Sequence, residues 1–128
     1  MDFSKHTILI VDDESAFRKF LRKIIEKEFN ANVVEAINPK EGFLYLNDNT
    51  PSLIILDMEM PVMDGFTALK RLRTMPDKRN IPVIACTALS SRELFLSLFD
   101  LKISDYIIKP SNSDAILAKI GRILNILE

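Results

Sequence analysis

The chain reads Leu53-Ile54-Ile55-Leu56-Asp57 in its middle and Ile8-Leu9-Ile10-Val11-Asp12-Asp13 near its start. Each run is short, partly β-branched and free of polar residues until its acidic end, which is typical of a strand buried on both faces of a parallel sheet. Carboxylates that converge at strand ends repel one another and lose hydration. A divalent cation is the obvious compensation, because carboxylate oxygens are its preferred ligands.

Apolar runs and helical patterns alternate along the whole chain. The strands are predicted at Thr7–Val11, Val33–Ala36, Leu53–Asp57, Pro82–Cys86 and Asp105–Ile108. The first helix is predicted to begin just after Ser15, its cap, and to end near Phe29. The other helices are predicted at about Pro39–Leu46, Gly65–Met75, Ser90–Leu101 and Ser113–Leu127. Strict alternation predicts an α/β fold, a single doubly wound five-stranded parallel sheet with five helices on its two faces.

A sheet of this kind places its site outside the carboxyl ends of the strands, where the strand order reverses. In the order 2-1-3-4-5, one of the common orders of doubly wound sheets, the first and third strands are neighbours at that point. The first strand ends at Asp12-Asp13 and the third at Asp57. The sequence therefore predicts that the three acids lie together.

The first helix has the clearest amphipathic pattern. Its apolar stripe comprises Phe17, Phe20, Leu21, Ile24, Ile25 and Phe29. The residues expected to face solvent on its other side are Arg18, Lys19, Arg22 and Lys23. The core stripe of the last helix comprises Ile116, Ile120, Ile123, Leu124 and Leu127. Besides Ser15, the predicted caps are Asn38 and Ser90.

Composition limits the number of domains and the classes of protein to which the chain can belong. With 128 residues, 48% hydrophobic and 27% charged, the chain is long enough for one folded domain with a real core. A net charge of −1 gives no reason to expect nucleic-acid binding. The single cysteine, Cys86, lies in an apolar run and is expected to be buried and structural. We see no signal peptide and no membrane-spanning run, so we expect a soluble, cytoplasmic protein.

Two more strand ends carry groups suited to phosphoryl transfer. The Asp57 carboxylate could attack a phosphoryl group and form an acyl phosphate, and Mg²⁺ held by the carboxylates would offset the repulsion between anions. Thr87 follows the fourth strand and can donate to a phosphoryl oxygen, and Lys109 follows the fifth and can pair with the new phosphate. Each residue alone is more often a turn residue, a strand end or a surface lysine, so the signal lies in the combination.

Four stretches resemble the receiver domain of bacterial two-component response regulators, which has a flavodoxin-like fold. The stretches are Leu9–Glu14, Leu56–Gly65, Thr87-Ala88 and Asp105–Pro110. Each is weak alone, but all four stand in the family's order and separations, and the likeness covers essentially all of residues 1–128. The resemblance implies one receiver domain, with no effector domain in this chain.

The resemblance implies that Asp57 is the phosphoacceptor and Mg²⁺ the cofactor. Asp13 and Asp57 would bind the ion directly, the backbone carbonyl of Glu59 would be a third protein ligand, and Asp12 would act mainly through water. The donor would be a histidine kinase or a histidine phosphotransfer protein. The chain would then be a signalling phosphoacceptor that assists only its own phosphorylation and dephosphorylation, not an enzyme.

The resemblance also implies a switch. Lys109 would contact the phosphoryl group, Thr87 would swing toward it, and Tyr106 would turn into the vacated space. The output would be a rearranged surface made by the fourth helix, fifth strand and fifth helix, which would bind a downstream protein or a second copy of the chain. The Lys109–Pro110 bond is a candidate for a cis peptide.

Three features set this chain apart from the usual pattern of the family. Lys102-Ile103 stands where the fourth helix of the family usually ends in Gly-Ala, so the left-handed glycine cap is missing. The same helix is apolar on nearly every side over Leu94–Phe99, which indicates either deeper burial or an exposed patch for a partner. Glu59, two residues after the acceptor, is expected to alter the rate of phosphate hydrolysis.

Three other functions are compatible with parts of the sequence. An aspartate-nucleophile phosphatase of the haloacid-dehalogenase type would use Asp57 and Glu59, but such enzymes carry the nucleophile on an early strand. A flavodoxin-like nucleotide binder would need phosphate-binding amides where this chain has Asp12-Asp13-Glu14, which repel phosphate. A degenerate receiver would act as an unphosphorylated interaction module, which the intact set of acids, threonine and lysine disfavours.

Overall fold

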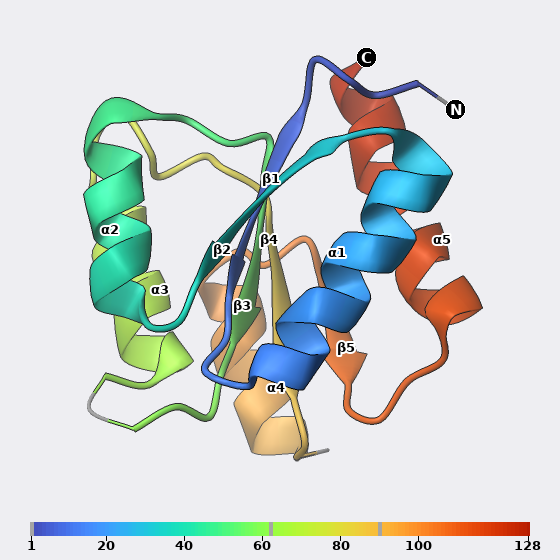
Figure 1. Cartoon of the computed structure of the whole chain (residues 1–128). Helices are drawn as coiled ribbons and strands as arrows, with labels where there is room; N and C mark the ends of the chain where they lie inside the picture. Colours follow the sequence, from blue (N-terminus) through green and yellow to red (C-terminus); the bar gives the residue numbers. More distant parts are fainter. Residues whose placement is uncertain (1, 62, 90) are drawn as a thin grey trace.

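A computed structural model describes residues 2–61, 63–89 and 91–128, and it shows a five-stranded parallel sheet between two layers of helices (Figure 1). The strands are β1 Thr7–Val11, β2 Asn32–Ala36, β3 Leu53–Asp57, β4 Val83–Thr87 and β5 Asp105–Ile108. The helices are α1 Ser15–Phe29, α2 Pro39–Asp48, α3 Gly65–Arg73, α4 Arg92–Asp100 and α5 Ser113–Leu127. The order β2-β1-β3-β4-β5 confirms the predicted topology.

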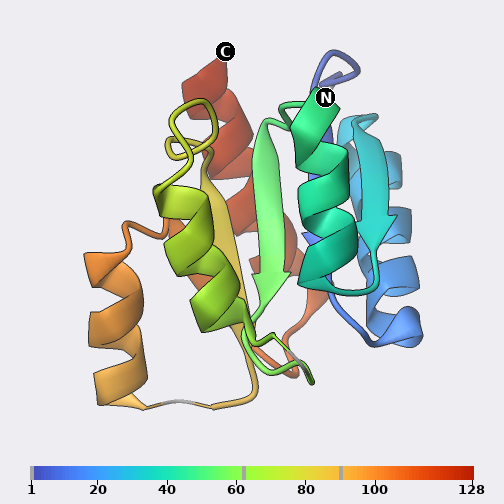
Figure 2. The ribbon, with the colours of Figure 1, turned by 90° about the vertical axis from the view of Figure 1, so that its left-hand side faces the viewer.

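The helices divide between the two faces of the sheet. Figure 2 shows α2, α3 and α4 in front of the sheet, with α1 and α5 behind it. Because successive side chains of a strand point to opposite faces, each buried strand contributes to both layers. Ile8 and Ile10 of β1 join one core with α1 and α5, while Leu9 and Val11 join the other with α2 and α3.

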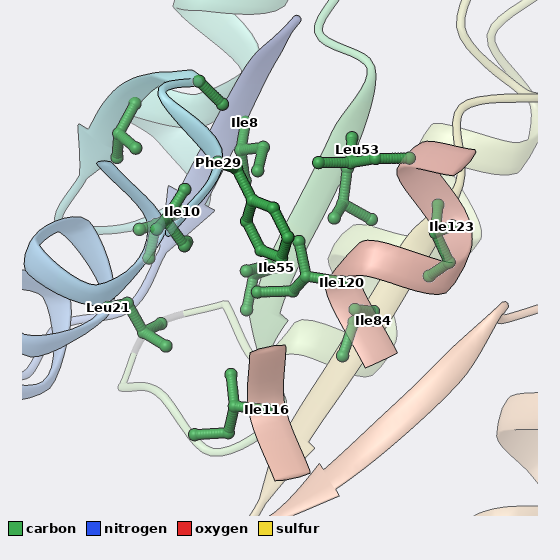
Figure 3. Close-up of a cluster of buried hydrophobic side chains, with 14 of the residues drawn as sticks. Ile8, Ile10, Leu21, Phe29, Leu53, Ile55, Ile84, Ile116, Ile120 and Ile123 are labelled. Carbon is green, nitrogen blue, oxygen red and sulfur yellow. The ribbon is translucent and has the colours of Figure 1, made fainter. Parts of the chain in front are cut away.

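The core between the sheet and the helices α1 and α5 consists mainly of aliphatic side chains, with the ring of Phe29 among them (Figure 3). Ile55 and Ile84 of the sheet face Leu21 of α1 and Ile116 and Ile120 of α5. Cys86 lies in the same cluster and is fully buried, as expected of a structural thiol. Its burial raises the pKa of the thiol far above the ordinary value, so it stays protonated.

Two predicted core positions are wrong. Phe20 of α1 is 37% exposed and Leu127 of α5 is 43% exposed, although both fit the helical spacing of their stripes. Phe20 instead lies beside Phe17, with 6.2 Å between the ring centroids. A spacing pattern counts both edges of an apolar stripe as buried, whereas the sheet covers only its centre.

Several element ends differ from the predicted ones. β4 runs through Thr87, because the Thr87 carbonyl accepts the Lys109 N–H at 2.7 Å and thus extends the ladder with β5. Ser15 is the first residue of α1 and not its cap, and Glu14 precedes it. Asn38 caps α2 as predicted, accepting the Glu41 N–H at 2.9 Å. Ser91 caps α4, and the predicted cap Ser90 lies outside the described residues.

The end of α4 is closed without glycine. Lys102 takes the left-handed conformation, with φ of 60°. Its carbonyl and that of Leu101 accept hydrogen bonds from the guanidinium of Arg73, at 3.1 and 2.8 Å. Carbonyls left free at a helix end need such partners. The Lys102 N–H donates to the Phe99 carbonyl at 2.9 Å and the Ile103 N–H to the Leu98 carbonyl at 3.4 Å, so the backbone closes the helix as a glycine cap would, and Arg73 binds the two carbonyls that follow the helix.

No helix in the described part of the chain combines the length and the apolar character needed to cross a bilayer.

Candidate functional site

Three carboxylates meet at the carboxyl end of the sheet. β1 and β3 are neighbours, with Val11 beside Leu56, so the residues that follow these two come out at the same edge. One oxygen from each of Asp12, Asp13 and Asp57 lies within 4.8 Å of the others. Asp12 and Asp57 are buried and Asp13 is exposed. The structure thus brings together the three acids that the sequence predicted.

Lys109 brings the neighbouring positive charge into this cluster. Its Nζ donates to Asp12 Oδ2 at 2.7 Å and lies 3.8 Å from Asp57 Oδ1. It also lies 4.3 Å from the centroid of the Phe17 ring on α1, a cation–π contact that fixes the lysine head over the site. The Lys109–Pro110 bond is cis, as the sequence suggested.

The electrostatics of the cluster are unbalanced. Burial and the nearby charge of Asp12 raise the pKa of Asp57 from 3.8 to about 6, although the Glu59 N–H and Lys109 oppose the shift. Burial by itself lowers the pKa of Lys109, but the hydrogen bond to Asp12 and the charges of both buried acids outweigh it and raise that pKa. One ammonium group therefore faces three carboxylates and does not neutralise them.

Gly65 allows the loop after β3 to fold back over the phosphoacceptor candidate. A Cβ at this position would lie 2.1 Å from the backbone oxygen of Asp57, which no side chain tolerates. The Gly65 N–H donates to the Met58 carbonyl at 3.2 Å. Asp64 caps α3 by accepting the Thr67 N–H at 2.8 Å. Gly65 is thus required by the close approach of the backbone.

Thr87 and Glu59 border the cluster from two loops. Thr87 is fully buried at the end of β4, one residue beyond Cys86, which pairs with Asp57. Its Oγ1 accepts the Leu89 N–H at 3.0 Å. The Glu59 N–H donates to Asp57 Oδ1 at 3.1 Å, and the Glu59 carboxylate accepts the Ala88 N–H at 2.7 Å. Glu59 thus connects the loop after β3 with the loop after β4.

Tyr106 lies within β5, before Lys109 in the chain, and its ring packs against α4. Its ring stacks on Phe95 with 4.5 Å between the centroids, and Phe99 meets it edge-on at 6.2 Å. The Nζ of Lys119, from α5, lies 4.7 Å from the centroid of the Tyr106 ring. Tyr106 is half-buried here and joins the three elements of the predicted output surface.

The apolar helix α4 leaves part of its surface uncovered. Leu98 is buried in the core, while Leu96 and Phe99 are 53% and 50% exposed. Ile108 at the end of β5 is 37% exposed. Of the two interpretations of the apolar Leu94–Phe99 segment, the structure therefore supports an exposed patch.

Comparison with known proteins gives the same answer as this geometry. The sequence profile described as "Response regulator receiver domain" matches residues 8–121, most of the chain. The chain belongs to the receiver-domain family of response regulators. Receiver domains serve two-component signalling as phosphoacceptors and usually bind Mg²⁺ at an acidic pocket.

Individual relatives support the assignment over nearly the full length. The chain is 32% identical to the chemotaxis protein CheY of Bacillus subtilis, over 94% of this chain and 98% of that protein. It is 37% identical to the transcriptional regulatory protein YvrH of the same organism, over 89% of this chain but only 47% of that longer protein. The receiver domain of the Francisella response regulator 1452 superposes with a TM-score of 0.87 at 27% identity, covering 96% of this chain and 99% of that one.

Arg18 is a third residue that the helical pattern placed wrongly, after Phe20 and Leu127. Arg18 was expected on the solvent face of α1, but it is only 8% exposed. Its Nη1 donates to the backbone carbonyl of Asp12 at 2.7 Å and its Nε to Glu35 Oε1 at 3.1 Å. The available signal was Glu35, an acid that follows Val33 and Val34 in strand β2. A charge in such a strand needs a partner on a covering helix.

Arg22 was also expected to face solvent, but its guanidinium is hydrogen-bonded to Glu35 and to the backbone of β2. Its Nε donates to Glu35 Oε2 at 2.7 Å and its Nη2 to the Val33 carbonyl at 3.0 Å. The hydrogen bonds from Arg22 and then Arg18, together with their charges, outweigh burial and lower the pKa of Glu35. The carboxylate of β2 is therefore ionised and paired.

Proposed function

We propose that this receiver domain is a Mg²⁺-dependent phospho-aspartate switch, in which Asp57 accepts the phosphoryl group. The observation that carries the proposal is the meeting of three carboxylate oxygens within 4.8 Å beside a single ammonium group. Such an excess of like charge is costly unless a ligand compensates it. The donor would be a histidine kinase or a histidine phosphotransfer protein, acting in the cytoplasm.

The donor set fits a hard divalent cation. Carboxylate and carbonyl oxygens with open positions for water are what Mg²⁺ prefers, and burial together with the nearby charge of Asp12 raises the pKa of Asp57, a cost that a bound cation would offset. We assign the ion to Asp12, Asp13, Asp57 and the backbone carbonyl of Glu59. When bound, Mg²⁺ would neutralise charge on the carboxylates and on the oxygens of the transferring group.

The chain's own residues would carry out the remaining steps. The Asp57 carboxylate attacks phosphorus, forming the bond from its oxygen to phosphorus while the bond from phosphorus to the donor nitrogen breaks. Lys109, held beside Asp12 and Asp57, pairs with the added anionic oxygens. Thr87 already accepts a hydrogen bond from Leu89, so its own hydroxyl hydrogen is free to be donated to a phosphoryl oxygen.

The signal would leave through Tyr106. Movement of Thr87 toward the phosphoryl group would open space at the end of β4, and the ring of Tyr106 would turn into it. Because this ring packs on Phe95 and Phe99, the turn would rearrange α4 and the exposed patch of Leu96, Phe99 and Ile108. A downstream protein or a second copy of the chain would read that change.

Mass spectrometry tests this proposal directly. The protein is incubated with Mg²⁺ and a small acyl phosphate donor, and its intact mass is measured with and without a chelator. We expect a gain of one phosphoryl group that is lost with the chelator and in Asp57→Asn but kept in the control Asp48→Asn, an exposed acid at the end of α2. A wild-type protein that gains no phosphoryl group would refute the proposal. Release of phosphate in large molar excess over protein would instead identify an enzyme.

A further inference from the structure

Arg18 lies behind the acidic cluster and touches its backbone. Although α1 carries it, its side chain is buried and reaches the carbonyl of Asp12, at 2.7 Å. Glu35 of β2 accepts from its Nε at 3.1 Å and so holds the guanidinium in place from the other side. The fixed fork of a guanidinium suits two acceptors set at an angle, a geometry that a lysine ammonium does not reproduce.

We propose that Arg18 is a positioning residue of the metal site. It fixes the peptide between Asp12 and Asp13, so that both carboxylates stay turned toward Asp57. The inference rests on the proposed function, because it concerns how well the same acidic cluster binds Mg²⁺. It adds a residue that touches neither the ion nor the phosphoryl group.

The two acids differ in how they are held. Asp12 has both side-chain oxygens engaged, by the Glu14 N–H at 2.8 Å and by Lys109 at 2.7 Å. Within residues 2–61, 63–89 and 91–128, the side chain of Asp13 makes no hydrogen bond. Its place beside Asp57 therefore depends on the backbone that carries it.

That backbone is held at the two peptides that flank Asp12. The Asp12 N–H donates to the Ala36 carbonyl at 3.1 Å, which continues the pairing of β1 with β2. The Asp12 carbonyl belongs to the next peptide, the one that leads into Asp13, and its acceptor site is filled by Arg18. Without Arg18 this peptide could rotate, and rotation would carry the carboxylate of Asp13 away from the cluster.

Charge and positioning make opposite predictions for this residue. As a nearby cation, Arg18 repels Mg²⁺, so removing its charge would tighten Mg²⁺ binding. As a positioning residue, it keeps a ligand in place, so its removal would weaken binding. The sign of the change in affinity therefore separates the two roles.

The test compares two neighbouring arginines of α1. Arg22 also bonds Glu35 but makes no contact with Asp12 among its described hydrogen bonds, so Arg22→Met is the matched control for Arg18→Met. Mg²⁺ dissociation constants are measured by titration calorimetry well below the melting temperature of each variant. We expect Arg18→Met to bind Mg²⁺ about tenfold more weakly, the lower end of the cost of removing a hydrogen bond that supports a metal ligand. Arg22→Met should stay near wild type.

The outcomes separate the inference from the proposed function. Wild-type protein that does not bind Mg²⁺ would overturn both. Mg²⁺ binding by wild type that is unchanged or tighter in Arg18→Met would overturn the inference alone. A general loss of stability would lower the melting temperature of both variants without changing the affinity of the folded protein, so it would not imitate the expected result.

A second pair of variants decides the matter if Arg18→Met does not fold. Arg18→Lys keeps the charge but cannot donate to Asp12 and Glu35 in the same fork, and Arg22→Lys is its control. Weaker Mg²⁺ binding in Arg18→Lys than in Arg22→Lys supports the positioning role. Equal binding in the two variants overturns it.

Discussion

The two ends of the sheet differ in how completely their polar and charged side chains are paired. At the amino end, which we define by His6, Ser52 and Glu128, each group has a partner. His6 Nδ1 lies 2.7 Å from Ser52 Oγ, its Nε2 lies 2.6 Å from Glu128 Oε2, and Lys5 also pairs with Glu128 at 3.2 Å. At the carboxyl end, Asp12, Asp13 and Asp57 share one close ammonium group.

The half-buried acids elsewhere in the fold resemble the amino end. Glu35 has two arginines, and Asp105 is bonded to Lys119 and Arg122 at 3.1 and 2.6 Å. Where a half-buried acid serves only the structure, the fold thus supplies it with cations. The carboxyl end is the exception, and local departures from such pairing are expected where a protein binds something. The difference between the ends is what locates the site.

The largest effect should come from the backbone of the carboxyl end. Gly65→Ala would force a Cβ to within 2.1 Å of the Asp57 carbonyl oxygen, a contact that only a backbone shift can relieve. We expect a loss of about 3 kcal/mol in the free energy of unfolding, the upper range for overpacking. Denaturant unfolding measures it.

Gly121→Ala in α5 is the control for that substitution. Its Cβ would lie 3.3 Å from the tip of the Phe29 ring, which can move, and alanine favours the helix by about 1 kcal/mol. We expect a small net change. Equal losses in the two variants would show that close backbone approach is not special to the carboxyl end.

The next effect is the response to Mg²⁺, which should distinguish the two ends. At a hundred times the dissociation constant, an ion that binds only the folded state stabilises it by about 2.7 kcal/mol. Thermal unfolding should show this gain in wild type and in Ser52→Ala, but most of it should vanish in Asp13→Asn. A full gain in Asp13→Asn would contradict the assignment of the ion to the carboxyl end.

Stability of the metal-free protein should depend on pH through Asp57. Its pKa rises from 3.8 in the unfolded chain to about 6 in the fold, so between these values the folded state binds more protons. Stability is therefore highest below the lower value and falls as pH rises toward 6. The full shift corresponds to about 3 kcal/mol, which we reduce to about 1–2 kcal/mol because the site opens to solvent at Asp13.

Asp57→Asn provides the readout for this dependence. The variant should be more stable than wild type at about pH 8, and the difference should shrink at about pH 4, where the Asp57 carboxyl is protonated in the folded state and partly protonated in the unfolded chain. Urea unfolding at both pH values measures it. A difference that stays constant with pH would mean that Asp57 carries no electrostatic cost.

The smallest effect should come from the amino end. Ser52→Ala removes one hydrogen bond to the largely buried ring of His6 and should cost about 1 kcal/mol. Phosphorylation of Asp57 should not change, because Ser52 lies at the opposite end of the sheet. A loss of phosphoryl uptake in this variant would show that the two ends are coupled.

The sequence was sufficient for most of the fold and for the meeting of the acids. Uninterrupted apolar runs that alternate with amphipathic segments leave few arrangements open, and in the order 2-1-3-4-5, one of the common ones, acids at the ends of β1 and β3 are neighbours. In the sequence, Gly65 is visible only as the last residue of a stretch shared with receiver domains. Its reason, the approach to Asp57, depends on coordinates.

What the sequence missed depends on contacts between distant residues. A helical pattern assigns Arg18 to solvent because it cannot show that Glu35 of β2 lies beneath it. The contact between Glu59 and Ala88 joins two loops 29 residues apart, and no spacing rule describes it. The support of Lys102 by Arg73 is of the same kind. Local patterns predict elements, while these side chains are placed by the packing of one element on another.

The most direct test of the unbalanced carboxyl end is a ¹³C NMR titration of the Asp57 side chain with and without Mg²⁺. We predict that its carboxyl carbon titrates with a pKa of about 6 in the metal-free protein and at clearly lower pH when Mg²⁺ is present. A carboxyl that titrates at its ordinary value and ignores Mg²⁺ would contradict the account, because the acids would then need no compensating cation.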